Sequence, residues 1–180
     1  MGAMPYENLA PWHDDPSDGL SALQSQFLDD NYDLPAVLQE HLDSARQAVQ
    51  SCKDDGDEYG LLDTYQTDLD YLESVTSKPI PDSPKDRIKI VRRIWESGGE
   101  GVGNILDITG VTDAGGIHVT RRMPDSEVEQ HLGTSTPSAD DAKHLLGKIA
   151  DKLGRGESVC FPVYDSGAPC GWWFAGYTVD

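Results

Sequence analysis

The sequence of 180 residues predicts an α+β fold, in which an N-terminal block of about four helices packs on a C-terminal β-β-α-β-β antiparallel sheet. Up to residue 97 the apolar residues recur at helical spacing, whereas after residue 103 they follow the patterns of strands. With 37% hydrophobic residues, the chain can bury a sizeable core. We expect residues 1–97 to form an acidic helical block and residues 98–180 an α+β sheet region, together one compact unit.

The first two helices are predicted by their capping residues. Asp15 is an N-cap before Pro16, which needs no amide hydrogen at the first helical position, and a helix of about three turns follows. Asp33 caps a longer helix that ends at Gly56. The apolar stripe of this second helix is continuous and consists of Leu34, Val37, Leu38, His41, Leu42, Ala45, Val49 and Cys52.

Two further helices complete the predicted block. Residues 58–77 have helical apolar spacing, and the short Asp54–Asp57 link makes this helix antiparallel to the preceding one. The prolines within residues 78–81 exclude a helix there. A fourth helix starts at Ser83-Pro84 and ends at Gly98-Gly99.

Strand patterns begin after the fourth helix. Residues 105–109 and 117–122 are rich in β-branched side chains and flank turn residues, which predicts a β-hairpin. A short helical turn at residues 126–131 and a helix over residues 138–153 follow.

The chain closes with a second predicted hairpin, formed by residues 158–164 and 172–179. Both alternating faces of these strands are apolar, as in a sheet that is covered on both sides. We expect helix 138–153 to cover one face and the N-terminal helical block the other. Pro162 cannot donate a ladder hydrogen bond, so its strand is expected at a sheet edge or with a bulge at this position.

The negative charge is concentrated in the first part of the chain. Residues 1–77 carry 17 acidic and 2 basic side chains, whereas residues 78–180 carry 15 and 12, for a formal net charge of −18. This potential repels nucleic acids and anionic membranes and attracts cations. The expected partner is therefore a basic protein. Adaptation of the whole organism to high salt is the alternative explanation.

No membrane span or secretory signal is predicted, because the chain has no run of about 18 apolar residues and no signal-peptide pattern at its N-terminus. The expected location is cytoplasmic. Cys52, Cys160 and Cys170 match neither a zinc site nor a disulfide framework. The registers expected for the final hairpin place Cys160 and Cys170 too far apart to bridge, so we expect reduced thiols.

Two segments superficially resemble ligand loops. Residues 98–104 are rich in glycine but lie between a helix and a predicted strand, the reverse of the order in a phosphate-binding loop. The acidic residues around Gly56 lack the spacing of a calcium loop. The sequence therefore predicts no metal site and no cofactor.

Candidate catalytic residues rest on residue type alone. His118 lies on a predicted strand and His144 on the covering helix, where either could meet Asp107 or Asp141 as in a catalytic dyad. Arg121 is a further candidate, although a salt bridge to an acidic helix is its expected role. No nucleophile motif accompanies these residues.

Candidate partner-binding residues lie in the acidic half. The carboxylates expected to project into solvent, off the apolar stripes, are Asp54, Asp57, Asp63 and Asp70. Trp12, which precedes the first helix, is expected either to dock the N-terminal arm on its own domain or to anchor a partner.

Two functional hypotheses follow. The first is a non-catalytic interaction protein that binds a basic protein partner through its acidic helical half. Immunity proteins that neutralise cationic nuclease or deaminase toxins share this acidic profile and size, an analogy of composition and not of motif. The alternative is a small enzyme or ligand-binding domain with a polar cleft between the helical block and the sheet.

Overall fold

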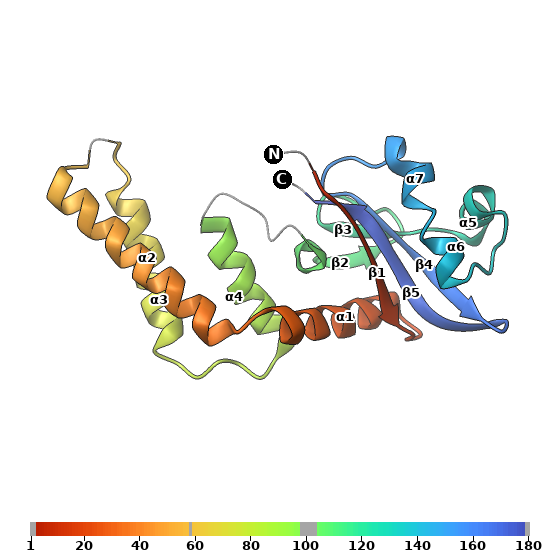
Figure 1. Ribbon diagram of the computed structural model, residues 1–180, viewed down its shortest axis with the longest axis horizontal. Coiled ribbons are helices and arrows are strands. Elements are labelled where there is room, and N and C mark those ends of the chain that lie inside the picture. Colours follow the sequence, from red (N-terminus) through yellow and green to blue (C-terminus); the bar gives the residue numbers. More distant parts are fainter. Residues whose placement is uncertain (1–2, 58, 98–103, 179–180) are drawn as a thin grey trace.

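A computed structural model describes residues 3–57, 59–97 and 104–178 (Figure 1). The first part of the chain contains β1 (Pro5–Pro11), α1 (Pro16–Asn31), α2 (Leu34–Asp55), α3 (Leu62–Thr76) and α4 (Pro84–Ser97). The next elements are the 3-10 helix η1 (Ile105–Asp107), β2 (Gly110–Thr112), β3 (Val119–Arg122), α5 (Asp125–Leu132) and α6 (Ala139–Ala142). The last are α7 (Leu146–Ile149), the 3-10 helix η2 (Ala150–Lys152), β4 (Ser158–Asp165) and β5 (Ala168–Tyr177). The α+β class is confirmed.

The four predicted N-terminal helices are present, and two of them start at the predicted caps. The Asp15 carboxylate accepts a hydrogen bond from the Ser17 amide at 2.8 Å, and Asp33 accepts one from the Ala36 amide at 3.2 Å. Each cap satisfies an amide that the first helical turn leaves without a partner. The apolar stripes of α2 and α3 then pack against each other and against α4, in a helical core that includes Leu38, Leu42, Leu69, Leu72 and Val91.

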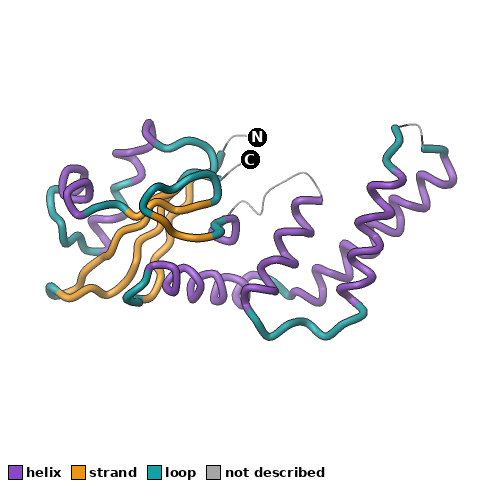
Figure 2. Tube along the Cα trace, turned by 180° about the vertical axis from the view of Figure 1, so that it is seen from behind, coloured by secondary structure: helices purple, strands orange, loops and turns teal. Residues whose placement is uncertain are grey.

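The predicted packing of the whole helical block on the sheet is wrong in one respect. The pair α2–α3 extends away from the sheet, and the helix that lies along the sheet is α1 (Figures 1 and 2). Leu20 and Leu23 of α1 pack with Trp172 and Phe174 of β5, whereas Leu28, farther along α1, joins the helical core. The stripes of α2 and α3 are already buried by helices, so they have no apolar face left for the sheet.

The sheet is mixed, and the antiparallel prediction is wrong. Its strand order is β1-β5-β4-β3-β2, in which β1, β5 and β4 are antiparallel neighbours whereas β4, β3 and β2 are parallel. The edge strand β1 was not predicted. Proline occupies both of its ends, and Ala10 is its one fully buried residue, so neither propensity nor apolar alternation marks it as a strand.

The predicted hairpin of residues 105–122 is also wrong. Ile105 to Asp107 form η1, which the Asn104 side chain caps by accepting the Leu106 amide at 2.9 Å. After β2 the chain makes a turn that leads into β3, and in this turn Gly115, Gly116 and His118 have φ values of 71°, 156° and 60°. This turn reverses the chain twice and leaves β2 and β3 parallel. A Cβ atom on Gly115 would lie 2.7 Å from Cβ of Arg121, so the turn requires glycine there.

The predicted helix over residues 138–153 is broken into α6, α7 and η2. Hydrogen bonds from the amides of His144 to Asp141 and of Leu145 to Ala142 span three residues, and they interrupt the α-helical ladder. The cover is nevertheless as predicted: Leu145 and Ile149 pack on Phe161 and Trp173 of the final hairpin. The opposite face of β4 and β5 lies under α1 and η1, so both faces of this hairpin are covered, as predicted.

The final hairpin is present, and its strands run closer to the turn than the predicted residues 164 and 172, because β4 ends at Asp165 and β5 begins at Ala168. Ser166 and Gly167 at its tip have φ values of 50° and 82°, the left-handed conformation that tight hairpins need. The strand β4 is central and not at an edge. Pro162 lies beyond Cys160, which is the last β4 residue paired with β3. A bulge follows at Val163/Tyr164. Cys160 lies opposite Phe174, and all three cysteines are free thiols.

Candidate functional site

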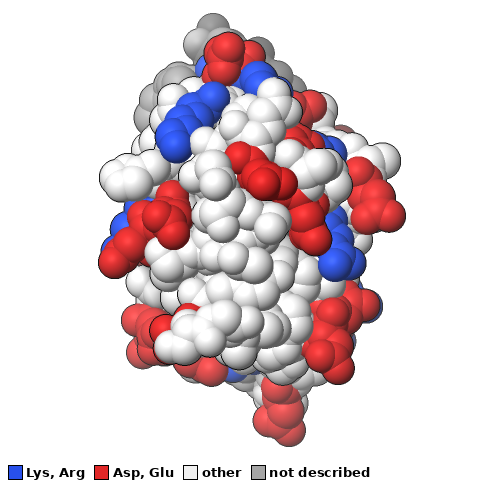
Figure 3. Space-filling view, turned by 90° about the vertical axis from the view of Figure 1, so that its right-hand side faces the viewer, with Lys and Arg blue, Asp and Glu red and all other residues white. Residues whose placement is uncertain are grey.

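The acidic helical hairpin, defined as residues 33–76 with α2, α3 and their link, is the most strongly charged part of the molecule. It carries 11 acidic and 2 basic side chains, half of the chain's net charge of −18. The hairpin projects from the body that contains the sheet (Figures 1 and 2). At the opposite end of the molecule, acidic and basic side chains are interspersed around an uncharged centre (Figure 3).

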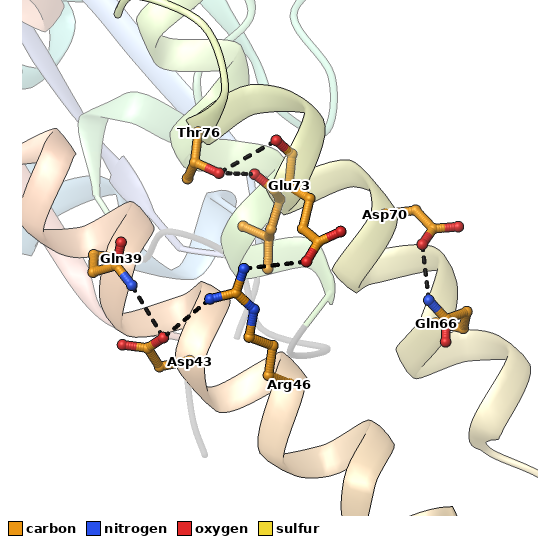
Figure 4. Close-up of polar contacts among 8 residues, drawn as sticks. Gln39, Asp43, Arg46, Gln66, Asp70, Glu73 and Thr76 are labelled. Carbon is orange, nitrogen blue, oxygen red and sulfur yellow. Dashed lines mark hydrogen bonds and ion pairs between the residues drawn. The ribbon is translucent and has the colours of Figure 1, made fainter.

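Three of the predicted partner-binding carboxylates are exposed on this hairpin, namely Asp54, Asp63 and Asp70. Asp54 accepts a hydrogen bond from the Gln50 side-chain amide at 2.8 Å. Asp70 accepts one from the Gln66 side-chain amide at 2.8 Å (Figure 4). A neutral amide orients a carboxylate without cancelling its charge. None of the three has a cationic partner among the described residues.

Asp57, the fourth predicted residue, has a structural role. Its Oδ1 atom accepts the backbone amides of Leu61 and Leu62 at 2.7 and 3.2 Å, at the start of α3. The first amides of a helix have no partner within the helix, and this carboxylate satisfies two of them. The helix begins at Leu62, later than the predicted start at residue 58.

Other carboxylates of the hairpin are engaged with cations. Arg46 lies between Asp43 and Glu73, at 3.7 and 3.2 Å, and joins α2 to α3 (Figure 4). Asp68 pairs with Arg93 of α4 at 3.0 Å. The Arg93 guanidinium also lies 5.5 Å from the centre of the Tyr71 ring. The two Arg93 contacts hold α3 on α4.

Two apolar side chains lie exposed at the link between α2 and α3, and the sequence interpretation missed them. The exposed fractions are 80% for Tyr59 and 39% for Leu61. Tyrosine next to a glycine in a short acidic link was the available signal. An exposed tyrosine among carboxylates gives this end of the hairpin an apolar contact as well as charge.

Trp12 docks the N-terminal arm on its own domain. Its ring stacks on Trp172 with the ring centres 5.3 Å apart and the planes at 9°. The Trp172 indole donates to the His13 carbonyl at 2.8 Å, and the Arg122 guanidinium lies 5.4 Å from the Trp172 ring centre. The arm is thus held over β5 by aromatic packing. A further role of Trp12 in partner binding stays a prediction.

The candidate catalytic residues are divided between the two faces of the sheet. Asp107 is buried in η1, and the carbonyl of His118 accepts the Thr109 amide at 2.7 Å nearby. His144 is exposed after α6, which covers the other face. Arg121 also points to that face, where it donates to both carboxylate oxygens of Glu127 on α5 at 2.7 and 2.8 Å. The salt bridge expected of Arg121 is therefore present, and it lowers the pKa of Glu127.

A cleft of about 380 Å³ lies between α1, α4 and the segment from Ile108 to Gly110, where the helical block meets the sheet. Its cationic residues are Lys85, Lys89 and Arg92, all on α4. Among the described residues that line it, none is acidic. In residues 3–57, 59–97 and 104–178, no group of three or more His, Cys, Asp or Glu side chains is placed to hold a metal ion.

Comparison of the chain with protein-family models, with curated proteins and with solved structures finds no match. In the part of the chain that the structure describes, no helix combines the length and apolar character needed to span a membrane.

Proposed function

We propose that the protein is a non-catalytic interaction protein that binds a basic protein partner through the acidic helical hairpin, as an immunity or inhibitor protein does. The sheet region acts as the scaffold that presents the hairpin. The alternative is a small enzyme or ligand-binding domain with a polar cleft between the helical block and the sheet. Its enzyme form has less support, because the candidate catalytic residues lie on two faces of the sheet and Arg121 is engaged with Glu127.

The observation that carries this proposal is the exposure of uncompensated carboxylates on a projecting helix pair. Asp54, Asp63 and Asp70 face solvent without cationic partners among the described residues, and their mutual repulsion opposes the folded state. A cationic partner would relieve that repulsion. Tyr59 adds an aromatic side chain of the kind that anchors protein interfaces.

The test combines partner capture with association kinetics. Immobilised wild-type protein should retain a basic protein at low salt, and D54N/D63N/D70N should retain less of it. With the purified partner, stopped-flow mixing should show association slowed about tenfold in the triple variant at low salt, with a flatter salt dependence, because charge steers encounter. The control variant E129Q/D151N/D165N removes three exposed carboxylates from the sheet region and should associate almost as fast as wild type.

A different variant separates the effect of charge on the association rate from the effect of apolar contact on the dissociation rate. Tyr59→Ala should raise the dissociation rate constant about tenfold while leaving the salt dependence of association unchanged, because it removes apolar contact and no charge. Equal association rates and salt slopes for wild type, the triple variant and the control variant would contradict the proposal. The acidity would then be a solubility or salt-adaptation feature.

A further inference from the structure

We infer that the cleft between α1 and α4 binds a small organic anion, with a phosphate or carboxylate group carried on an apolar body. The site lies apart from the acidic helical hairpin and is independent of the proposed partner. The inference rests on the distribution of charge along α4, on the chemistry of the cleft wall and on the size of the cleft.

The cations of α4 divide into two groups. The helix carries five of the 14 lysine and arginine residues of this acidic chain. Arg87 pairs with Asp29 of α1 at 2.8 Å and Arg93 pairs with Asp68 of α3 at 3.0 Å, so these two join helices. The others, Lys85, Lys89 and Arg92, lie three and four residues apart, which places them in one row along the cleft.

The two lysines are available to a ligand. Lys85 makes no ion pair in the described part of the chain. Lys89 pairs with Asp86 at 3.1 Å, but both side chains are more than half exposed, and an ion pair of that kind contributes little. An anion in the cleft would meet both ammonium groups. Each can donate several charge-assisted hydrogen bonds.

Buried polar groups hold the wall behind these lysines in place. The buried Gln24 side chain donates to the carbonyls of Ile105 and Ile108 at 2.9 and 2.7 Å. Arg92 donates to the carbonyls of Leu106 and Ile108. These bonds tie α1 and α4 to η1, so the cleft is preformed and a ligand would not have to order its wall.

The rest of the lining suits an apolar body with polar edges. Leu20, Ile88 and Ile108 supply the apolar wall, and the hydroxyl groups of Ser17, Ser21 and Ser83 lie along it. A volume of about 380 Å³ is at the lower end of the range for small-molecule sites. A long polyanion would in addition be repelled by the net charge of −18, so one small anion is the favoured occupant.

The test uses phenyl phosphate as the probe, with inorganic phosphate and phenol supplying its two halves separately. Binding is followed by amide chemical shifts in ¹⁵N-labelled full-length protein. Phenyl phosphate should shift amides of residues 17–24, 84–92 and 108–110 saturably, with a Kd below about 10 mM. Inorganic phosphate and phenol should each bind at least about tenfold more weakly. Benzoate in place of phenyl phosphate shows whether the site prefers a carboxylate or a phosphate group.

Variants decide whether the shifts report this site. K85Q/K89Q should weaken phenyl phosphate binding about tenfold. K53Q/K143Q is the matched control, because Lys53, like Lys85, makes no ion pair in the described part of the chain, and Lys143, like Lys89, pairs with an aspartate three residues away. This control should change the Kd of phenyl phosphate less than twofold. Ser21→Trp should fill the cleft and abolish binding, whereas D54N/D63N/D70N should retain it, which separates this inference from the proposed function. Thermal unfolding confirms that each variant is folded.

Three results would overturn the inference. The first is the absence of saturable shifts in the named residues. The second is an equal loss of affinity in K85Q/K89Q and K53Q/K143Q, which would show a nonspecific charge effect. The third is a glutamate-rich peptide that shifts the same amides at lower concentration than phenyl phosphate, because the cleft would then be a peptide site.

Discussion

Arg121 and Glu127 form a two-point ion pair between β3 and α5, and both side chains are less than one-third exposed. The planar guanidinium matches the carboxylate, so two parallel hydrogen bonds form from one pair of side chains. The hydrogen bond from Arg121 is the main reason that the pKa of Glu127 is lowered. Arg121, a catalytic candidate in the sequence, therefore has the salt bridge expected of it, and this bridge links a strand to its covering helix.

Acid should remove the contribution of this pair. The pKa of Glu127 in the folded protein lies below its usual value of 4.5. The ion pair therefore contributes its full stabilisation above pH 4.5, and this stabilisation is lost as the pH falls through the pKa of the folded protein. Urea unfolding of wild type and E127Q should differ by about 1 kcal/mol at neutral pH and converge below pH 4.5. E129Q, an exposed change on the same helix, is the control. A difference that does not shrink as the pH falls below 4.5 would show that E127Q acts through packing.

Cys160 should be the least reactive thiol of the chain. Cys160 lies in β4 and is buried in the cluster that includes Leu20 of α1 and Phe174 of β5. This burial raises the pKa of Cys160 to about 12, so almost no thiolate forms at pH 8, whereas Cys170 is exposed. Intact-mass measurement after alkylation should show labelling of Cys170 but not Cys160 in native protein, and three labels after unfolding without reductant. Fewer than three labels in unfolded protein would reveal a disulfide, and fast native labelling of Cys160 would show an open hairpin.

At the scale of elements, the acidic link between α2 and α3 combines two kinds of carboxylate. Asp54 faces solvent at the end of α2, whereas Asp57 accepts two amides at the start of α3. Sequence position alone does not separate them, because both lie within two residues of Gly56 in the same acidic run. Their effects on stability should nevertheless differ.

Asp57→Ala should destabilise the protein by about 1 kcal/mol, because two amides at the start of α3 lose their acceptor. Asp57→Asn keeps an oxygen acceptor and should cost less. Asp54→Ala, the control, should stay within about 0.5 kcal/mol of wild type. Urea unfolding followed by far-UV circular dichroism measures all three. Equal values for Asp57→Ala and Asp54→Ala would show that the cap contributes nothing measurable.

At the scale of the whole molecule, the helical core and the sheet cores are joined by α1 and η1. Leu23 of α1 and Ile105 of η1 pack under the sheet, whereas Leu28 and Leu106 of the same elements pack among the helices. The sheet is completed from the other end of the sequence, where β1 pairs with β5 over its whole length. The N-terminal arm is therefore part of the fold and not an appendage.

Removal of residues 1–12 should destabilise the whole protein by more than about 2 kcal/mol and promote aggregation, because it exposes the edge of β5 and the Trp172 ring. Removal of residues 1–3 leaves β1 and its pairing intact and is the control. Urea unfolding and light scattering measure the two effects. A truncated protein that is as stable and monomeric as the control would show that β1 is dispensable.

Sequence patterns predicted much of the acidic surface, whereas a cleft between the helical block and the sheet was expected only under the alternative hypothesis and without its lining residues. Asp54, Asp63 and Asp70 were expected in solvent because they lie off the apolar stripes, a property of each helix by itself. The sequence contains a signal for a cationic row on α4, because Lys85 and Lys89 stand four residues apart, but no prediction was made from it. It did not show that Ser17 and Ser21 of α1 lie opposite that row, because α1 and α4 are far apart in the chain.

Local sequence patterns specify the four N-terminal helices and the final hairpin, and they indicate that both faces of this hairpin are covered. Caps, turn residues and apolar periodicity act over a few residues, so they can be read from the chain directly. Tertiary structure alone decided the edge strand β1, the parallel direction of β2 and β3, and the projection of α2–α3 away from the sheet. These features depend on which distant segments bury each other's apolar surface, and no local pattern records that choice.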